Sequence, residues 1–159
     1  MTQEFMQDAL AEDLRELFKD YTLKNSLGVE RRVQVFCQDL PIREGDDEET
    51  VPEAPPEPYI IVRLSEGELP SPGEVQTAEA ALVICVQDPA RDRQGYRDAM
   101  HIVNAILHRY GANAIFGRRY EVLMPIRWAA QEDDTHPYYF AAVGMKVSTP
   151  ALYKEVPEA

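Results

Sequence analysis

The sequence has little of what marks exported, membrane-spanning or nucleic-acid-binding proteins. Its 159 residues include two cysteines and one tryptophan, and 16 lysines and arginines stand against 28 aspartates and glutamates. The formal net charge of −12 repels phosphate groups, because sequence-independent binding to nucleic acid requires a basic surface. No stretch approaches the roughly 20 apolar residues that span a bilayer. We therefore expect a soluble acidic protein with no direct sequence-specific nucleic-acid binding and no membrane partner.

Cysteine use and the first residues of the chain point to a reducing compartment. Cys37 and Cys85 lie far apart in apolar, strand-like segments, where buried free thiols are more common than a disulfide. Residues 1–10 have neither a basic start nor an unbroken apolar run, so we expect no signal peptide. The length and the 45% hydrophobic content are sufficient for one core.

Signatures of catalysis and of cofactor binding are missing as well. The sequence contains no HExxH, CxxC, GxSxG, GxxxxGKS or GxGxxG motif. His101 and His108 would lie about 10 Å apart along a helix, which is too far for both to bind one metal ion. We predict that the protein is not an enzyme and has no catalytic residue, no cofactor and no metal site.

One group of acids keeps an enzymatic alternative open. Glu132, Asp133 and Asp134 lie close to His136, and clustered carboxylates can hold Mg²⁺ for phosphodiester hydrolysis. Acids in a turn are more often simply solvated, since Asp is favoured at turn positions. A Mg²⁺-dependent nuclease therefore remains the weaker alternative.

Hydrophobic periodicity predicts two principal helices. Apolar residues recur at spacings of three and four from Met6 to Tyr21, which predicts a helix over about 3–21. The same spacing from Tyr96 to Tyr110 predicts a second helix, capped by Asp92 and ended by Gly111 in a left-handed conformation.

Five segments have the composition of β-strands. They are residues 32–38, 59–64, 80–87 and the two arms of a long C-terminal hairpin, 120–128 and 138–148. Pro125 cannot donate to a strand ladder, so its arm is expected at a sheet edge or with a bulge. We predict an α+β fold with a mainly antiparallel sheet, two principal helices packed on one face and a long C-terminal β-hairpin.

Residues 41–58 interrupt this pattern with seven acids and five prolines. We predict an acidic, proline-rich mobile loop with little that can be buried. The loop is too short to separate two domains. The expected organisation is one domain over 1–152 and a flexible tail over 153–159.

Aromatic side chains gather around the hairpin. Trp128, Tyr138, Tyr139 and Phe140 either fill the core or anchor a partner. Because side chains alternate along a strand, Tyr138 and Phe140 point away from the face of Tyr139. One side of this arm therefore needs a second surface, which favours a subunit contact.

Several phrases of the sequence resemble a known family. They are QDLPIRE (38–44), PYIIVRLSEGE (58–68), DRQGYRDAMHIVNAI (92–106), IRWAAQEDDTHPYYFAAV (126–143) and STPAL (148–152). They resemble small proteins of tailed bacteriophages and prophages, the tail terminator or tail completion proteins of head-tail joining. The resemblance covers about residues 8–152.

The resemblance implies a structural protein of virion assembly without catalytic residues. The family forms a ring, typically a hexamer, that caps the tail tube and faces the head connector. This implies three partners: further copies of the chain, the tail tube protein and the head-tail connector protein. It implies the bacterial host cytoplasm during assembly and then the head-proximal end of the virion tail. An acidic lumen would repel passing DNA. An acidic binding module or DNA-mimic inhibitor is the alternative.

Two groups of residues are candidates for the subunit contact. The scarce arginines are expected to cluster and to pair with acids of a neighbour, or else to be ordinary solvated surface. The hairpin group is Trp128, Glu132, Asp133, Asp134, His136, Tyr138 and Phe140, and the arginine group is Arg91, Arg93, Arg97, Arg118 and Arg119.

Overall fold

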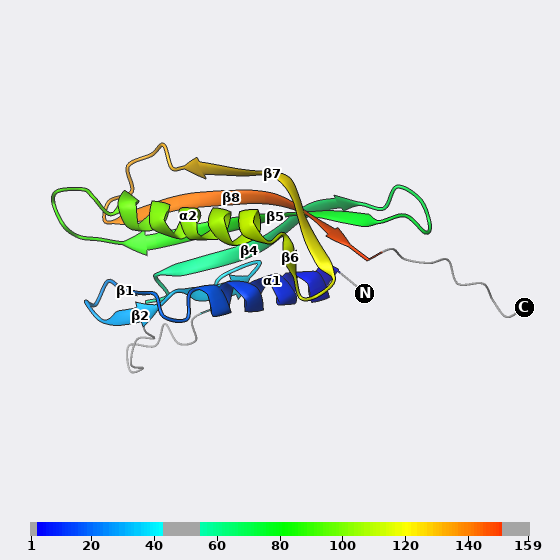
Figure 1. Cartoon of the computed structure of the whole chain (residues 1–159). Helices are drawn as coiled ribbons and strands as arrows, with labels where there is room; N and C mark the ends of the chain where they lie inside the picture. The colour runs from blue at the N-terminus through cyan, green and yellow to red at the C-terminus, as the bar shows by residue number, and fades with distance from the viewer. Residues whose placement is uncertain (1–2, 43–54, 151–159) are drawn as a thin grey trace, which may run out of the picture.

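The computed structural model describes residues 3–42 and 55–150, and the elements follow one another as Figure 1 shows. There are two helices, α1 (Gln3–Leu17) and α2 (Tyr96–Ala112). The strands are β1 (Thr22–Lys24), β2 (Glu30–Arg32), β3 (Gln34–Cys37), β4 (Tyr59–Glu68), β5 (Gln76–Gln87), β6 (Ile115–Phe116), β7 (Tyr120–Ala130) and β8 (Tyr138–Thr149).

Six of the strands form one sheet in the order β3-β4-β5-β8-β7-β6. All neighbours are antiparallel except β3 and β4, which are parallel. β1 and β2 form a small separate hairpin. The predicted α+β fold, with a mainly antiparallel sheet and the long hairpin of β7 and β8, is confirmed.

Both helices cover the same face of the sheet (Figure 1). Alternate residues of the strands point to this face, and they form one hydrophobic core with the apolar stripes of the helices. The largest fully buried side chains include Met6, Leu10, Leu14, Ile60, Leu82, Ile84, Ile102, Ile106, Tyr110 and Phe116. The helix-free face carries a smaller cluster, in which Tyr59, Ile61 and Cys85 are buried.

The ends of the helices differ from the sequence-based expectation. α1 stops at Leu17 and the chain turns before Tyr21. Gly95 is the N-cap of α2 and makes no side-chain cap, so the prediction for Asp92 is wrong; its carboxylate accepts from the amide of Gln94 instead. Gly111 lies inside the helix, which runs on to Ala112. A glycine that remains helical costs only local stability, so it need not end a helix.

The predicted strand over 32–38 is divided between β2, which ends at Arg32, and β3, which ends at Cys37, and Gln38 follows directly after β3. Gln38 has a φ of 66°, and its side-chain Oε1 accepts from the amide of Leu64 at 2.7 Å and from Nε2 of Gln7 at 2.8 Å. Nε2 of Gln7, a buried residue, also donates to the carbonyl of Val62. This pair of glutamines therefore ties α1 to the parallel edge of the sheet.

The end of the predicted acidic loop is packed against the body. Glu57 is only 3% exposed, and its Oε1 accepts from the amide of Ser26 at 3.1 Å. Arg31 donates to the carbonyl of Pro55. Within the segment predicted as an acidic loop, Glu57 and Pro58 are therefore buried. Residues 43–54 and the predicted tail at 153–159 lie outside the described residues.

Asp13 connects the two helices. Its carboxylate accepts from the hydroxyl of Tyr110 at 2.7 Å and from the guanidinium of Arg109 at 3.0 Å.

In the described part of the chain no helix is long and apolar enough to cross a membrane. Both cysteines are free thiols.

Candidate protein interface at the hairpin

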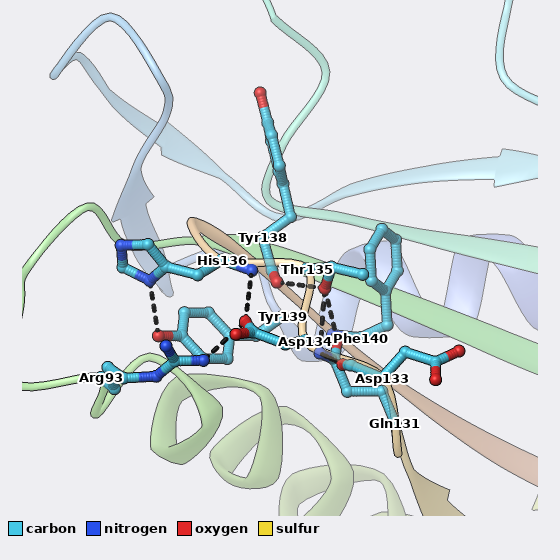
Figure 2. Close-up of polar contacts among 9 residues, drawn as sticks. All are labelled: Arg93, Gln131, Asp133, Asp134, Thr135, His136, Tyr138, Tyr139 and Phe140. Carbon is cyan, nitrogen blue, oxygen red and sulfur yellow. Dashed lines mark hydrogen bonds and ion pairs between the residues drawn. The ribbon is translucent and has the colours of Figure 1, made fainter.

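The turn that joins β7 to β8 is held by one side chain, that of Gln131. Its Nε2 donates to the carbonyl of Asp133 at 2.6 Å and to Oγ1 of Thr135 at 2.9 Å. Its Oε1 accepts from the amide of Phe140. Oγ1 of Thr135 donates in turn to the carbonyl of Tyr138. These contacts span the turn from one strand to the other (Figure 2) and give it a fixed shape.

An ion pair ties this turn to the segment before α2. Arg93 lies 2.5 Å from Asp134, and each side chain is more than half exposed. The hydrogen bond to Arg93 and a further one from the backbone of His136 lower the pKa of Asp134. The same hydrogen bond raises the pKa of Arg93. An exposed ion pair adds little stability, so its main effect is to orient the turn.

Tyr139 is the buried centre of this region. Its hydroxyl lies 3.0 Å from Nδ1 of His136, and its ring packs against Gly95 at the start of α2. A Cβ at Gly95 would collide with carbons of the Tyr139 ring. The absence of a side chain at Gly95 therefore lets the helix approach β8 closely. Figure 2 shows His136 and Arg93 beside Tyr139, with Tyr138 pointing away from them.

An apolar groove lies between the first turns of α2 and the edge of the sheet. Its volume is about 400 Å³. Trp128 is 52% exposed and Tyr96 is 48% exposed, so two large aromatic side chains meet solvent here. We call this surface the Trp128 groove, and it is lined by Tyr96, Ala99, Met100, Trp128, Ala130, Gln131, Tyr139, Phe140 and Ala141.

The hairpin aromatics do not form one patch. Trp128 pairs in register with Val143, which is buried in the main core, so Trp128 lies on the helix-covered face. Phe140 pairs with Cys85 and packs in the small cluster of the opposite face. Tyr138, on the same side as Phe140, is 37% exposed. The expected separation of Tyr138 and Phe140 from Tyr139 is confirmed, and Trp128 belongs with Tyr139.

The arginines do not cluster as expected. Arg91, Arg93 and Arg97 lie at the start of α2, whereas Arg118 and Arg119 follow its end in the turn between β6 and β7. A helix of 17 residues is about 25 Å long, so the two groups lie at opposite ends of α2. Arg93 pairs with Asp134, and Arg97 stacks on the ring of Tyr96 at 6.0 Å.

The acidic group of the turn has limited capacity for a cation. Asp134 is engaged by Arg93, while Glu132 and Asp133 are exposed. Among residues 3–42 and 55–150, no group of three or more His, Cys, Asp or Glu side chains could hold a metal ion.

Three contributors to this region were not identified from the sequence. Tyr96 and Met100 belong to the apolar stripe that predicts the second helix, yet Tyr96 is half exposed in the groove. Gln131 organises the turn through its amide. The only signal for Tyr96 in the sequence is its place at the N-terminal end of the apolar stripe.

Comparisons with known proteins support the fold. No family model matches the sequence, and no curated protein matches it. Among solved structures, one protein whose name carries no functional description aligns with a TM-score of 0.53 at 12% identity, over 99% of each chain. At this identity the likeness concerns the arrangement of helices and strands alone.

Proposed function

We propose that this protein is a structural subunit of a bacteriophage tail, a tail terminator or completion protein. Copies of the chain associate into a ring, typically of six, that caps the tail tube and joins it to the head connector. The assignment to phage tails rests on the sequence phrases described above. The protein acts in the bacterial host cytoplasm during assembly and then at the head-proximal end of the tail.

The observation that best supports association between copies of the chain is the exposure of Trp128 beside Tyr96 at the edge of the sheet. Exposed large aromatic side chains around an apolar groove are characteristic of protein contacts. The turn beside the groove is organised by Gln131 and Arg93. Binding therefore costs little ordering of this turn, because its shape is already fixed.

The charge of the chain suits a ring through which DNA passes. The net charge is −12, and in the proposed ring carboxylates face the lumen. Like charges repel the phosphate backbone and prevent it from adhering during transit.

A tube-capping assay tests this function. Tail tube protein of the same phage is polymerised in the presence of the purified chain, and tube lengths and ends are measured by electron microscopy. We expect ring-shaped density at one end of each tube and an arrest of growth. Tubes of unchanged length with bare ends would contradict the proposal.

A further inference from the structure

One edge of the main sheet is open along β7. β6 pairs only with Tyr120 and Glu121, and the amide of Val122 donates to the carbonyl of Ala114. Over residues 123–130, no described strand lies on this side of β7. An open edge presents unpaired backbone donors and acceptors, so it can accept a further strand.

A second open edge lies on β4, beyond the end of β3. β3 pairs with β4 only over Tyr59–Val62, and no described strand lies on the outer side of β4 over residues 65–68. Residues 65–75 are all exposed, and we call them the β4–β5 arm. The two strands extend past α2 at this end (Figure 1). A groove of about 360 Å³ beside Gln3 and residues 64–69 leaves this edge accessible.

The outer edge of β3, in contrast, is already occupied. The carbonyl of Val35 accepts from the guanidinium of Arg15 at 2.9 Å. The carbonyl of Cys37 accepts from the amide of Asp39 at 2.8 Å. Such contacts protect an edge strand from pairing with another chain. The longer open edges of the described sheet are therefore those of β7 and of the arm.

The arm carries acids on one side. Glu66 and Glu68 share a face, because side chains alternate along a strand. The register places Glu79 opposite Glu66, and like charges directly opposite each other destabilise a strand pair. Lys146 lies opposite Glu79 in β8, but none of these acids forms an ion pair within the described part of the chain. Residues 64–90 contain no lysine or arginine, so the arm favours a basic partner.

The edge of β7 offers the matching side chains. Arg127 is exposed and forms no ion pair with any described residue. Its neighbour Trp128 points to the other face of the sheet, towards the groove. An added strand that places acids beside Arg127 must therefore place its alternate residues beside Trp128. In the arm these residues are Gly67, which has no side chain, and Leu69, which is 42% exposed.

We propose that residues 65–69 of the arm in one copy pair with residues 126–130 of β7 in a second copy. The acids then lie on the face of Arg127, and Leu69 lies on the face of the Trp128 groove. Residues opposite each other share a face in parallel and in antiparallel pairs alike. The match therefore holds for either direction of the strands, whereas a shift by one residue would reverse it.

The contact cannot form within one chain. β5 and β8 lie between β4 and β7 in the sheet, so the outer edges of β4 and β7 face in opposite directions. Three strand spacings place these two strands about 14 Å apart. The contact joins different edges of two copies, and a repeated heterologous contact gives a closed ring when the rotation closes. The inference rests on the proposed function in that both require copies to associate, and it adds which strands meet.

Sedimentation equilibrium of the full chain measures the contact directly. We expect the wild type to associate between about 1 μM and 1 mM subunit. Arg127→Glu should raise the dissociation constant at least about tenfold, because a carboxylate then faces the acids of the arm. Adding Glu66→Arg and Glu68→Arg to the same chain restores opposite charges. This triple variant should return to within about threefold of the wild-type dissociation constant.

Lys24→Glu is the matched control. It makes the same change of charge at an exposed position of the separate β1–β2 hairpin. It should leave the dissociation constant within about twofold of wild type. Circular dichroism verifies that each variant is folded.

Three outcomes overturn the inference: a wild type that stays monomeric up to about 1 mM, an Arg127→Glu variant that associates as well as Lys24→Glu, or a triple variant without recovery. If the chain forms rings that do not depend on Arg127, this contact is wrong and the ring proposal stands. If the variants behave as expected but the chain never caps tubes, the proposed function fails alone.

Discussion

At the scale of single residues, Gln7 is a buried polar side chain that joins α1 to the sheet. It is 6% exposed and donates 2.8 Å hydrogen bonds to Oε1 of Gln38 and to the carbonyl of Val62. In Gln7→Leu the side chain keeps about the same volume but has no amide. Oε1 of Gln38 and the carbonyl of Val62 therefore each lose one hydrogen-bond donor. We expect a loss of about 1 to 3 kcal/mol in the free energy of unfolding, measured by urea denaturation.

Gln3→Leu is the matched control for this experiment. Gln3 lies on the same helix and is exposed, so the substitution should change the free energy of unfolding by less than about 0.5 kcal/mol. Equal effects of the two substitutions would show that the buried hydrogen bonds contribute nothing.

Cys85 makes the stability depend on alkaline pH. Burial raises the pKa of its thiol from 9.0 to about 12, and the nearby carboxylate of Glu57 also raises it, against a hydrogen bond from Tyr59. The unfolded chain therefore loses this proton first. The stabilisation is complete below about pH 9 and is lost as the pH rises towards 12.

Cys85→Ala removes this contribution. Between about pH 9 and pH 10.5 the wild-type free energy of unfolding should fall more steeply than that of the variant, by about 1.4 kcal/mol per pH unit. Urea denaturation at stepped pH measures both slopes. Burial also raises the pKa values of Tyr59 and Tyr110, so some fall remains in the variant. Identical slopes would contradict the assignment to Cys85.

At the scale of elements, the turn between β7 and β8 depends on Gln131. Gln131→Ala removes the side-chain hydrogen bonds to Asp133, Thr135 and Phe140, including the acceptor for the amide of Phe140. We expect hydrogen exchange at the amide of Phe140 to accelerate about tenfold, which corresponds to about 1.4 kcal/mol of local opening. Mass spectrometry of exchanged peptides over 131–140 measures it.

The adjacent acid gives a matched control. Glu132 lies in the same turn and is exposed, so Glu132→Ala should leave the exchange of Phe140 within about twofold of wild type. A Gln131→Ala variant as protected as the wild type would show that the backbone alone determines the turn.

Elements with strong periodicity were predictable from the sequence. The apolar stripes predicted both helices, and the β-branched runs predicted β4, β5, β7 and β8. The irregularity expected at Pro125 is present, since the register of β7 and β8 shifts between Leu123 and Arg127. The alternation of side chains along β8 also correctly predicted that Tyr139 lies on the face opposite to that of Tyr138 and Phe140.

The parts that were missed depend on contacts between distant segments. The parallel pairing of β3 with β4 is not encoded in either strand alone. Burial of Glu57 depends on the amide of Ser26, 31 residues earlier. The groove exists because α2 begins beside the sheet edge, which leaves Tyr96 and Trp128 exposed together. Periodicity identifies the apolar face of a helix but not where the sheet beneath it ends.

At the scale of the whole molecule, the account requires copies of the chain to associate through the surface around the hairpin. Trp128 and Tyr138 lie on opposite faces of the sheet. Substitutions at the two positions therefore distinguish which face forms the interface between copies. Trp128→Asp places a charge in the groove and should lower the mass in solution. If Tyr138→Asp lowers it instead, the helix-free face is the interface.

The most direct test is the mass of the purified chain by light scattering after gel filtration. One chain has a mass of 18.1 kDa. We predict a discrete particle of about six chains, either alone or at the end of tail tubes, that Trp128→Asp dissociates. A particle of one chain both alone and with tubes present would contradict the account.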